Sequence, residues 1–91
     1  MAEIRWAPSA DRHGVPHDQA IYAMVNPLYY EPEFDEPRVP GGVRPDLYIG
    51  PVGPGLGVTL LEIMTNRYPG VLVIFHVMIA RKKHLIRMEE N

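Results

Sequence analysis

The chain has 91 residues, no cysteine and a formal net charge of −2 with its four histidines neutral. This length encloses one hydrophobic core, so residues 1–91 should form a single domain. The composition excludes disulfides and thiolate metal sites, and the nearly balanced charge excludes a global field that attracts nucleic acid. The longest apolar run, residues 71–80, is too short to span a bilayer, and we expect a cytoplasmic protein that binds no membrane.

Two short helices are predicted near the N-terminus. Residues 3–6 alternate polar and apolar side chains and predict a first strand. Ser9 can then cap one helical turn that leaves through Gly14. A second helix should begin around Pro16 and end at Asn26-Pro27, because a residue before proline avoids helical angles. Helical spacing predicts that its core-facing residues are Ile21, Met24, Val25 and Leu28.

The rest of the chain predicts strands and a long loop. Residues 29–34 favour a strand, which Pro32 confines to a sheet edge or a bulge. The proline- and glycine-rich residues 35–45 predict a surface loop. Further strands are expected over residues 47–52, 60–66 and 71–79. Short connections between them favour an antiparallel meander. The predicted fold is therefore α+β, with two short N-terminal helices packed on an antiparallel sheet of four to five strands.

Several short motifs follow one another in a fixed order: Trp6-x-Pro8, Arg12-His13-Gly14-Val15, Ala20, Asn26-Pro27, Ile49-Gly50 and Ala80-Arg81-Lys82. Together with the order of the elements, they make the whole chain resemble the BrnT family, toxins of type II toxin–antitoxin systems with a RelE-like fold. The resemblance implies a ribosome-independent endoribonuclease. It also implies a partner antitoxin that restrains the toxin and acts as a repressor.

Cleavage of RNA by its own 2′-hydroxyl requires a base, an acid and cations beside the phosphate. His76 is the first acid–base candidate, and Glu62 could orient its ring if the two residues lie opposite each other on neighbouring strands. Arg81 is expected to stabilise the phosphate, and His13 could join this site through the fold. The alternative for His76 is a core histidine that hydrogen-bonds Glu62 or Tyr48. The spacing of the histidines suits no metal, so neither metal nor cofactor is expected.

Cationic and aromatic side chains supply candidates for RNA binding: Arg12, Lys82, Lys83, Arg44 and Trp6. Each has a structural alternative, since the lysines can keep a strand end soluble and Trp6 can belong to the core. Arg44 could instead bind an acidic antitoxin segment. Strict strand alternation puts His76 and Arg81 on opposite faces. The strand must therefore end or bulge before Arg81 if both serve one site.

Three hypotheses of function remain open from the sequence. The first is a metal-independent endoribonuclease toxin that cuts RNA and pairs with a cognate antitoxin. The second is a catalytically inactive BrnT-like binding module, partner or co-repressor of a DNA-binding antitoxin. Ala7 and His76, where the family typically has aspartate and arginine, favour it. The third is a small-ligand domain with a pocket between helices and sheet. The many tyrosines predict self-association, or pairing with the antitoxin, through an apolar face beside residues 35–45.

Overall fold

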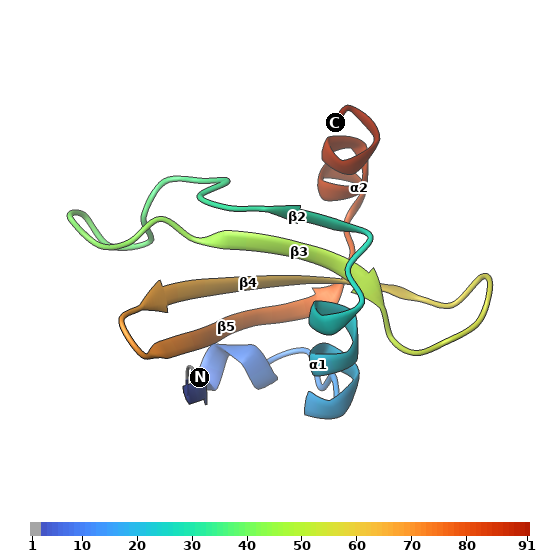
Figure 1. Cartoon of the computed structure of the whole chain (residues 1–91), viewed down its shortest axis with the longest axis horizontal. Helices are drawn as coiled ribbons and strands as arrows, with labels where there is room; N and C mark the ends of the chain where they lie inside the picture. The colour runs from blue at the N-terminus through green and yellow to red at the C-terminus, as the bar shows by residue number, and fades with distance from the viewer. Residues whose placement is uncertain (1–2) are drawn as a thin grey trace.

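The computed structural model describes residues 3–91 and has α+β architecture (Figure 1). Its elements follow the chain in this order: β1 (Glu3–Trp6), the 3-10 helix η1 (Pro8–Asp11), α1 (His17–Val25), β2 (Tyr29–Glu31), β3 (Asp46–Pro51), β4 (Leu60–Tyr68), β5 (Val71–Ile79) and α2 (Lys82–Glu89). The strands form one sheet in the order β1-β5-β4-β3-β2.

The sheet is mixed rather than antiparallel. The meander of β3, β4 and β5 is antiparallel as predicted, and β2 also pairs with β3 in an antiparallel arrangement at the edge. The strand β1, however, pairs with β5 in parallel, so the expectation of an antiparallel sheet is wrong at that edge. The reason is the connection: β1 reaches β5 across the whole domain, whereas the other strands are joined by turns or a loop.

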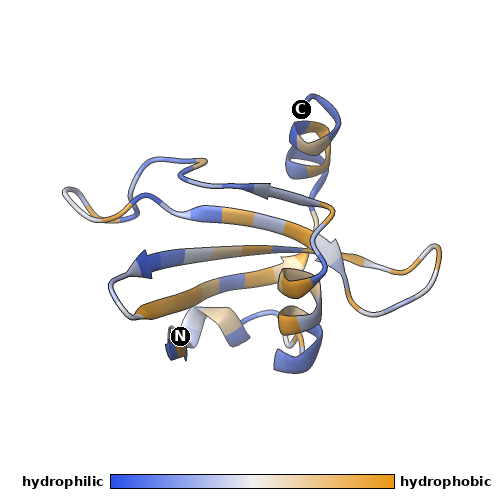
Figure 2. Ribbon diagram, in the orientation of Figure 1, coloured by the Kyte–Doolittle hydropathy of each residue, from blue (hydrophilic) through white to orange (hydrophobic). Residues whose placement is uncertain are grey.

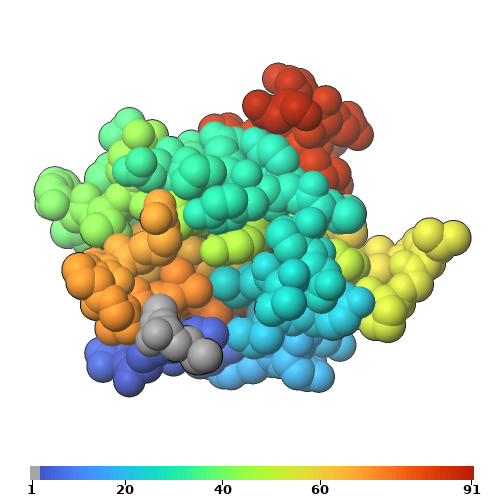
Figure 3. All heavy atoms as spheres, viewed as in Figure 1, coloured from blue at the N-terminus to red at the C-terminus, as the bar shows by residue number. Residues whose placement is uncertain are grey.

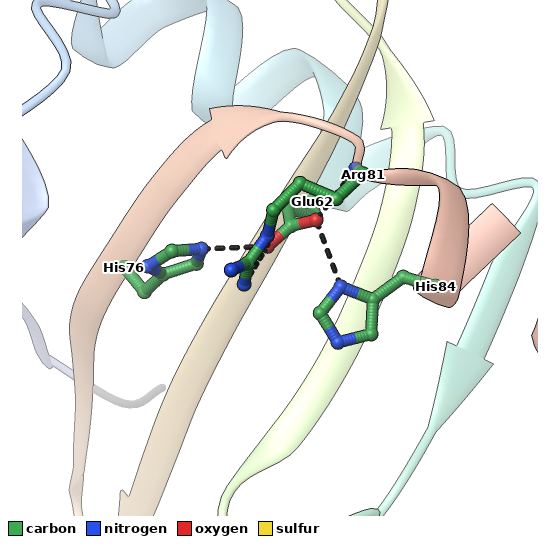
Figure 4. Close-up of polar contacts among 4 residues, drawn as sticks. All are labelled: Glu62, His76, Arg81 and His84. Carbon is green, nitrogen blue, oxygen red and sulfur yellow. Dashed lines mark hydrogen bonds and ion pairs between the residues drawn. The ribbon is translucent and has the colours of Figure 1, made fainter.

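The two faces of the sheet differ in what covers them. We call the face under α1 and η1 the helix face; Ile63 and Val77 point to it. Their strand neighbours Glu62 and His76 point to the opposite face, which we call the site face, because side chains alternate along a strand. In Figure 4, α1 lies behind the sheet, and α2 stands at the near side, beside the site face.

The helix face carries the apolar core, which consists of Ala10, Ala20, Ala23, Leu61, Ile63, Ile74 and Val77. Two small alanines of α1 let the helix approach the sheet closely. A Cβ at Gly50 would lie 2.2 Å from the Ala23 carbonyl oxygen, so this strand position accepts only glycine. The apolar colour of β3 to β5 in Figure 2 continues onto α1, whereas α2 is mostly polar.

The predicted core face of α1 is partly wrong. Val25 and Leu28 are 72% and 62% exposed, whereas Ala20 and Ala23 are fully buried. Because α1 lies so close to β3, small side chains fill the contact and the larger ones lie at its margin. The predicted end of the helix is confirmed, since Asn26 is the C-cap residue of α1.

The predicted first helical turn exists as η1, with a different role for its serine. Ser9 does not cap the turn; its hydroxyl donates a hydrogen bond of 2.6 Å to the Phe75 carbonyl oxygen and so ties η1 to β5. Gly14 adopts a left-handed φ of 69°, as expected of the exit. The expectation of two N-terminal helices did not include α2 at the other end of the chain, which forms a third helical element.

The strand bounds predicted from turn residues are close to those observed, and β5 has the predicted bounds. The register of β4 and β5 contains a bulge: Met64 pairs with His76, but Thr65 pairs with Ile74, so Phe75 is the extra residue. Glu62 pairs with Met78, which corrects the expectation that it lies opposite His76. Glu62 and His76 are diagonal neighbours instead, within reach of long side chains.

Two loops extend from the body. Residues 52–59 protrude between β3 and β4, as Figure 3 shows in yellow, and Leu56 at the tip is fully exposed. Residues 35–45 form the predicted surface loop beside the far end of β4. No helix within residues 3–91 has the length and apolarity needed to cross a bilayer.

Candidate functional site

A buried glutamate is the centre of the polar side chains on the site face. Glu62 lies in the middle of β4 and is 0% exposed. His76 Nε2 lies 2.7 Å from its Oε2, and His84 Nδ1 lies 2.8 Å from its Oε1 (Figure 4). One carboxylate thus holds an imidazole from β5 and another from α2. We call Glu62, His76, Arg81 and His84 the carboxylate cluster.

Arg81 completes the shell around this carboxylate. Its main-chain N–H donates to Glu62 Oε1 at 2.7 Å, and its Nε and Nη2 donate to Oε2 at 3.0 and 2.7 Å. Arg81 reaches the site face because β5 ends at Ile79, so Arg81 is the extended residue before α2. The strand therefore ends before Arg81, as a shared site requires. The Arg81 side chain is 41% exposed, so it also contacts solvent.

His84 comes from the first turn of α2 and is the least accessible of the three cluster residues that donate to Glu62. Its side chain is 7% exposed, and the Phe34 ring packs edge-on against it at 5.9 Å between centroids. Sequence reasoning gave His84 no role. The spacing of Arg81 and His84 could have indicated this contact. The two residues are three positions apart at the start of a helix, and such positions lie on the same side.

A separate ion pair fixes the direction of α2. Arg87 donates to both carboxylate oxygens of Glu31 on β2, at 2.7 and 3.0 Å, and to the Phe34 carbonyl oxygen at 2.9 Å. Hydrogen bonds from Arg87 and then from Tyr29 lower the pKa of the Glu31 carboxyl. These contacts anchor α2 to the sheet edge and so hold His84 over Glu62.

The hydrogen bonds decide the charge of Glu62. Burial by itself raises the pKa of this carboxyl, but the donors from His76, Arg81 and His84 outweigh burial and hold the pKa far below the usual glutamate range. An ionised carboxylate only accepts hydrogen bonds, so His76 Nε2 and His84 Nδ1 must carry protons. His76 Nδ1 and His84 Nε2 are then the ring nitrogens that do not contact Glu62.

His13 lies next to this cluster, as predicted. Its ring packs edge-on against the His76 ring at 6.0 Å between centroids, and the residue is exposed. The 3-10 helix η1 carries it there, because Ser9 is tied to the bulge of β5. The three candidate catalytic residues His76, Arg81 and His13 therefore gather at one place, since His76 and Arg81 share Glu62 Oε2.

The RNA-binding candidates separate into two groups. Arg12 precedes His13, and Lys82 and Lys83 follow Arg81; all three of these cationic residues are exposed. The Trp6 ring stacks on His17 at 3.6 Å with 4° between the planes and packs against the core of the helix face. Arg44 lies in the loop of residues 35–45, where its Nε donates to the Asp35 carbonyl oxygen at 3.1 Å.

No group of three or more histidine, cysteine, aspartate or glutamate side chains within residues 3–91 is arranged to hold a metal ion. The carboxylate cluster instead directs its nitrogens at carboxylate oxygens.

No protein-family model, no curated protein and no solved structure matches this chain. The arrangement of the site therefore carries the functional argument. Chemically, it combines two neighbouring imidazoles, His13 and His76, with a partly exposed guanidinium and an ionised carboxylate.

Proposed function

We propose that this chain is a metal-independent endoribonuclease and the toxin of a type II toxin–antitoxin pair. The observation that carries the proposal is the meeting of His76, His13 and Arg81 beside the buried Glu62 carboxylate. Two imidazoles and a guanidinium supply a base, an acid and a phosphate ligand, which are the groups that RNA cleavage by the 2′-hydroxyl needs. The resemblance to BrnT toxins supports the same activity.

His76 is the proposed base. Its Nε2–H donates to Glu62, which fixes the ring and leaves Nδ1 to take the proton of the 2′-hydroxyl. The carboxylate also stabilises the imidazolium that this transfer creates, as a buried acid does in other histidine-dependent enzymes. With 20% of its side chain exposed, His76 is accessible to an RNA strand on the site face.

His13 is the proposed acid, and Arg81 is the proposed phosphate ligand. His13 is exposed beside His76, so a protonated His13 ring can deliver a proton to the leaving 5′-oxygen. Two Arg81 nitrogens are bound to Glu62, while the remaining N–H groups of the guanidinium can meet a phosphate as negative charge builds. Glu62 and His84 position these groups without touching substrate.

Cleavage of a fluorescent RNA in EDTA tests the proposal. The purified wild-type chain, freed of any antitoxin, should release fragments that end in a 2′,3′-cyclic phosphate, and an all-2′-deoxy substrate should stay intact. His76→Gln keeps a donor for Glu62 but cannot titrate, so it should lower the cleavage rate at least about 100-fold. His13→Ala and Arg81→Ala should lower it similarly.

The matched control is His17→Ala, which removes an exposed histidine that pairs with Asp11 and stacks on Trp6, away from the cluster. It should retain the wild-type rate. A folded wild-type chain that leaves RNA intact and does not slow growth on expression contradicts the enzymatic proposal. So does full activity of folded His76→Gln and Arg81→Ala.

A catalytically inactive binding module is the second candidate, and a patch of exposed apolar residues favours it. Val25, Leu28 and Tyr30 are 72%, 62% and 42% exposed, and they follow one another from the end of α1 into the edge strand β2. An apolar patch at a sheet edge suits a protein partner. Co-purification of an antitoxin that Val25→Ser releases, together with no RNA cleavage by the freed chain, would favour the module.

A further inference from the structure

A pocket lies at the far end of the same sheet, between the loop of residues 35–45 and the end of β4. Its volume is about 250 Å³. Six residues line it: Arg38, Val39, Gly42, Val43, Asn66 and Tyr68. In Figure 1 the loop is drawn in green, and it lies at the opposite end of the sheet from α2. No residue of the carboxylate cluster lines this pocket.

The pocket and the carboxylate cluster share the site face. Asn66 and Tyr68 follow Glu62 along β4 at intervals of two, so strand alternation points them to the same side. Asn66 lies four positions after Glu62 on β4, which is roughly 13 Å at about 3.3 Å per residue. The Arg38 guanidinium lies 4.3 Å from the centroid of the Phe75 ring, and Phe75 precedes His76. A strand of RNA at the cluster would therefore continue toward the pocket.

The chemistry of the lining fits a flat aromatic ligand with a polar edge. Val39 and Val43 provide apolar walls, and Tyr68, which also lines the pocket, is 46% exposed, so it is accessible to a stacking ligand. Asn66 Oδ1 is buried and has no hydrogen-bond partner within residues 3–91. An acceptor in that state is unfavourable, and a ligand that donates a hydrogen bond to it removes the cost. Asn66 also lines the pocket, so a donor group of a ligand held there lies next to this amide.

We propose that this pocket is a nucleobase subsite, which holds an amino-bearing base of the RNA strand while the phosphate to be cleaved lies at the carboxylate cluster. The proposal rests on the proposed ribonuclease function. Asn66 Oδ1 accepts a hydrogen bond from the exocyclic amine of adenine, cytosine or guanine, and Tyr68 stacks on the ring. Arg38 stays close to the adjoining phosphate. Uracil lacks the amine and should bind more weakly, by up to about tenfold.

Side-chain amide resonances of the isotope-labelled protein test the pocket independently of catalysis. The probes are AMP, CMP, GMP, UMP and inorganic phosphate. The three amino-bearing nucleotides should shift the Asn66 amide with affinities up to about tenfold above that of UMP. Asn26 and Asn91 are internal controls, because their amides already donate to the carbonyl oxygens of Tyr22 and Arg87. Equal shifts with phosphate alone, or no shift at Asn66, would overturn the subsite.

Cleavage-site mapping then separates the subsite from the enzymatic proposal. In an RNA of mixed sequence, Asn66→Ala should lose base preference at one position beside the cut while still cleaving, and Asn26→Ala should keep it. Nucleotide binding at Asn66 without any cleavage supports a nucleotide pocket and contradicts the ribonuclease. Cleavage with unchanged preference in folded Asn66→Ala contradicts the subsite and leaves the ribonuclease standing.

Discussion

The helix face and the site face of the sheet are built from neighbouring residues of the same strands, yet the side chains that they bury differ in chemistry. On the helix face, Ile63 and Val77 belong to one apolar cluster with the alanines of α1. On the site face, Glu62 is just as buried but holds a charge and three cationic or imidazole partners. The helix face stabilises the domain by apolar contact, whereas the site face also fixes polar groups in position beside the buried Leu47 and Ile49, which pair with Met64 and Glu62.

Neighbouring residues of β4 therefore belong to different parts of the protein. Ile63 should matter for stability alone, whereas Glu62 should matter for both stability and chemistry. A buried charge network of this kind costs desolvation and is retained where orientation is needed, which we take as the reason for its presence here. Measuring both stability and RNA cleavage in variants of each face distinguishes these two roles.

The largest expected effect is on the helix face. Ile63→Ala leaves a cavity between β4 and α1 and should lower the free energy of unfolding by about 4 kcal/mol. The loss is large because Ile63 is fully buried and the surrounding side chains fill the cavity only in part. Urea denaturation followed by circular dichroism measures it, and the activity per folded molecule should stay unchanged. Ile4→Ala, at a 45% exposed position of β1, should cost under about 1 kcal/mol. Equal losses at both positions would contradict this picture of the core.

Glu62→Gln should come next, with a loss of about 3 kcal/mol, because the amide leaves the buried histidine and arginine donors without their charge partner. Unlike Ile63→Ala, it should also abolish RNA cleavage by the molecules that remain folded. Denaturation and cleavage assays on the same preparation test both effects. If the variant is as stable as wild type, the cluster contributes orientation only.

The pH dependence of stability follows from the lowered pKa of Glu62. A carboxyl whose folded pKa lies below its unfolded pKa contributes stability above the unfolded value, about 4.3, and loses it as pH falls toward the folded value. The stability difference between wild type and Glu62→Gln should therefore shrink below about pH 4.5, by up to about 1.4 kcal/mol per pH unit. Denaturation curves from pH 7 to pH 3 measure it, and Glu3→Gln, on exposed β1, should follow wild type.

The smallest effect should come from the anchor of α2. The side chains of Arg87 and Glu31 are 40% and 29% exposed, so Arg87→Gln should cost only about 1 kcal/mol. Hydrogen exchange should accelerate in α2 but not in α1, and cleavage should fall several-fold as His84 loses its support on Glu62. Glu89→Gln, exposed on the same helix, should leave both measurements unchanged. Unaltered exchange in α2 would show that His84 alone holds the helix.

Local sequence predicted the strands well and the packing less well. Glycine and proline mark the turns, so β5 and the edge position of β2 followed from the residues alone. Which side of α1 packs on the sheet depends on the distance between α1 and β3. Gly50 of β3 permits the short distance, and the sequence of α1 alone does not reveal this. For this reason Val25 and Leu28 are exposed although their spacing is that of a core face.

The candidate site was also only partly predictable. His76, Arg81 and His13 were named from their residue types and motifs, and the fold brings them together. His84 could not be assigned, because its contact with Glu62 depends on the direction of α2. That direction is set by Arg87 and Glu31, which lie 56 residues apart. The ribonuclease activity and the antitoxin remain predictions.

The bulge at Phe75 has a consequence for how this site could arise or be lost. Ile74 and Val77 both face the helices although they are three positions apart, because the extra residue between them shifts the alternation of the strand. In a regular strand that kept Phe75 but had no bulge, His76 would share a side with Ile74 and enter the dry core. Deleting Phe75 should instead spare the cluster, because His76 would then directly follow Ile74 and alternation would leave its imidazole on the site face. A residue inserted before His76 that no bulge absorbs would turn the imidazole inward while every other residue of the cluster is kept.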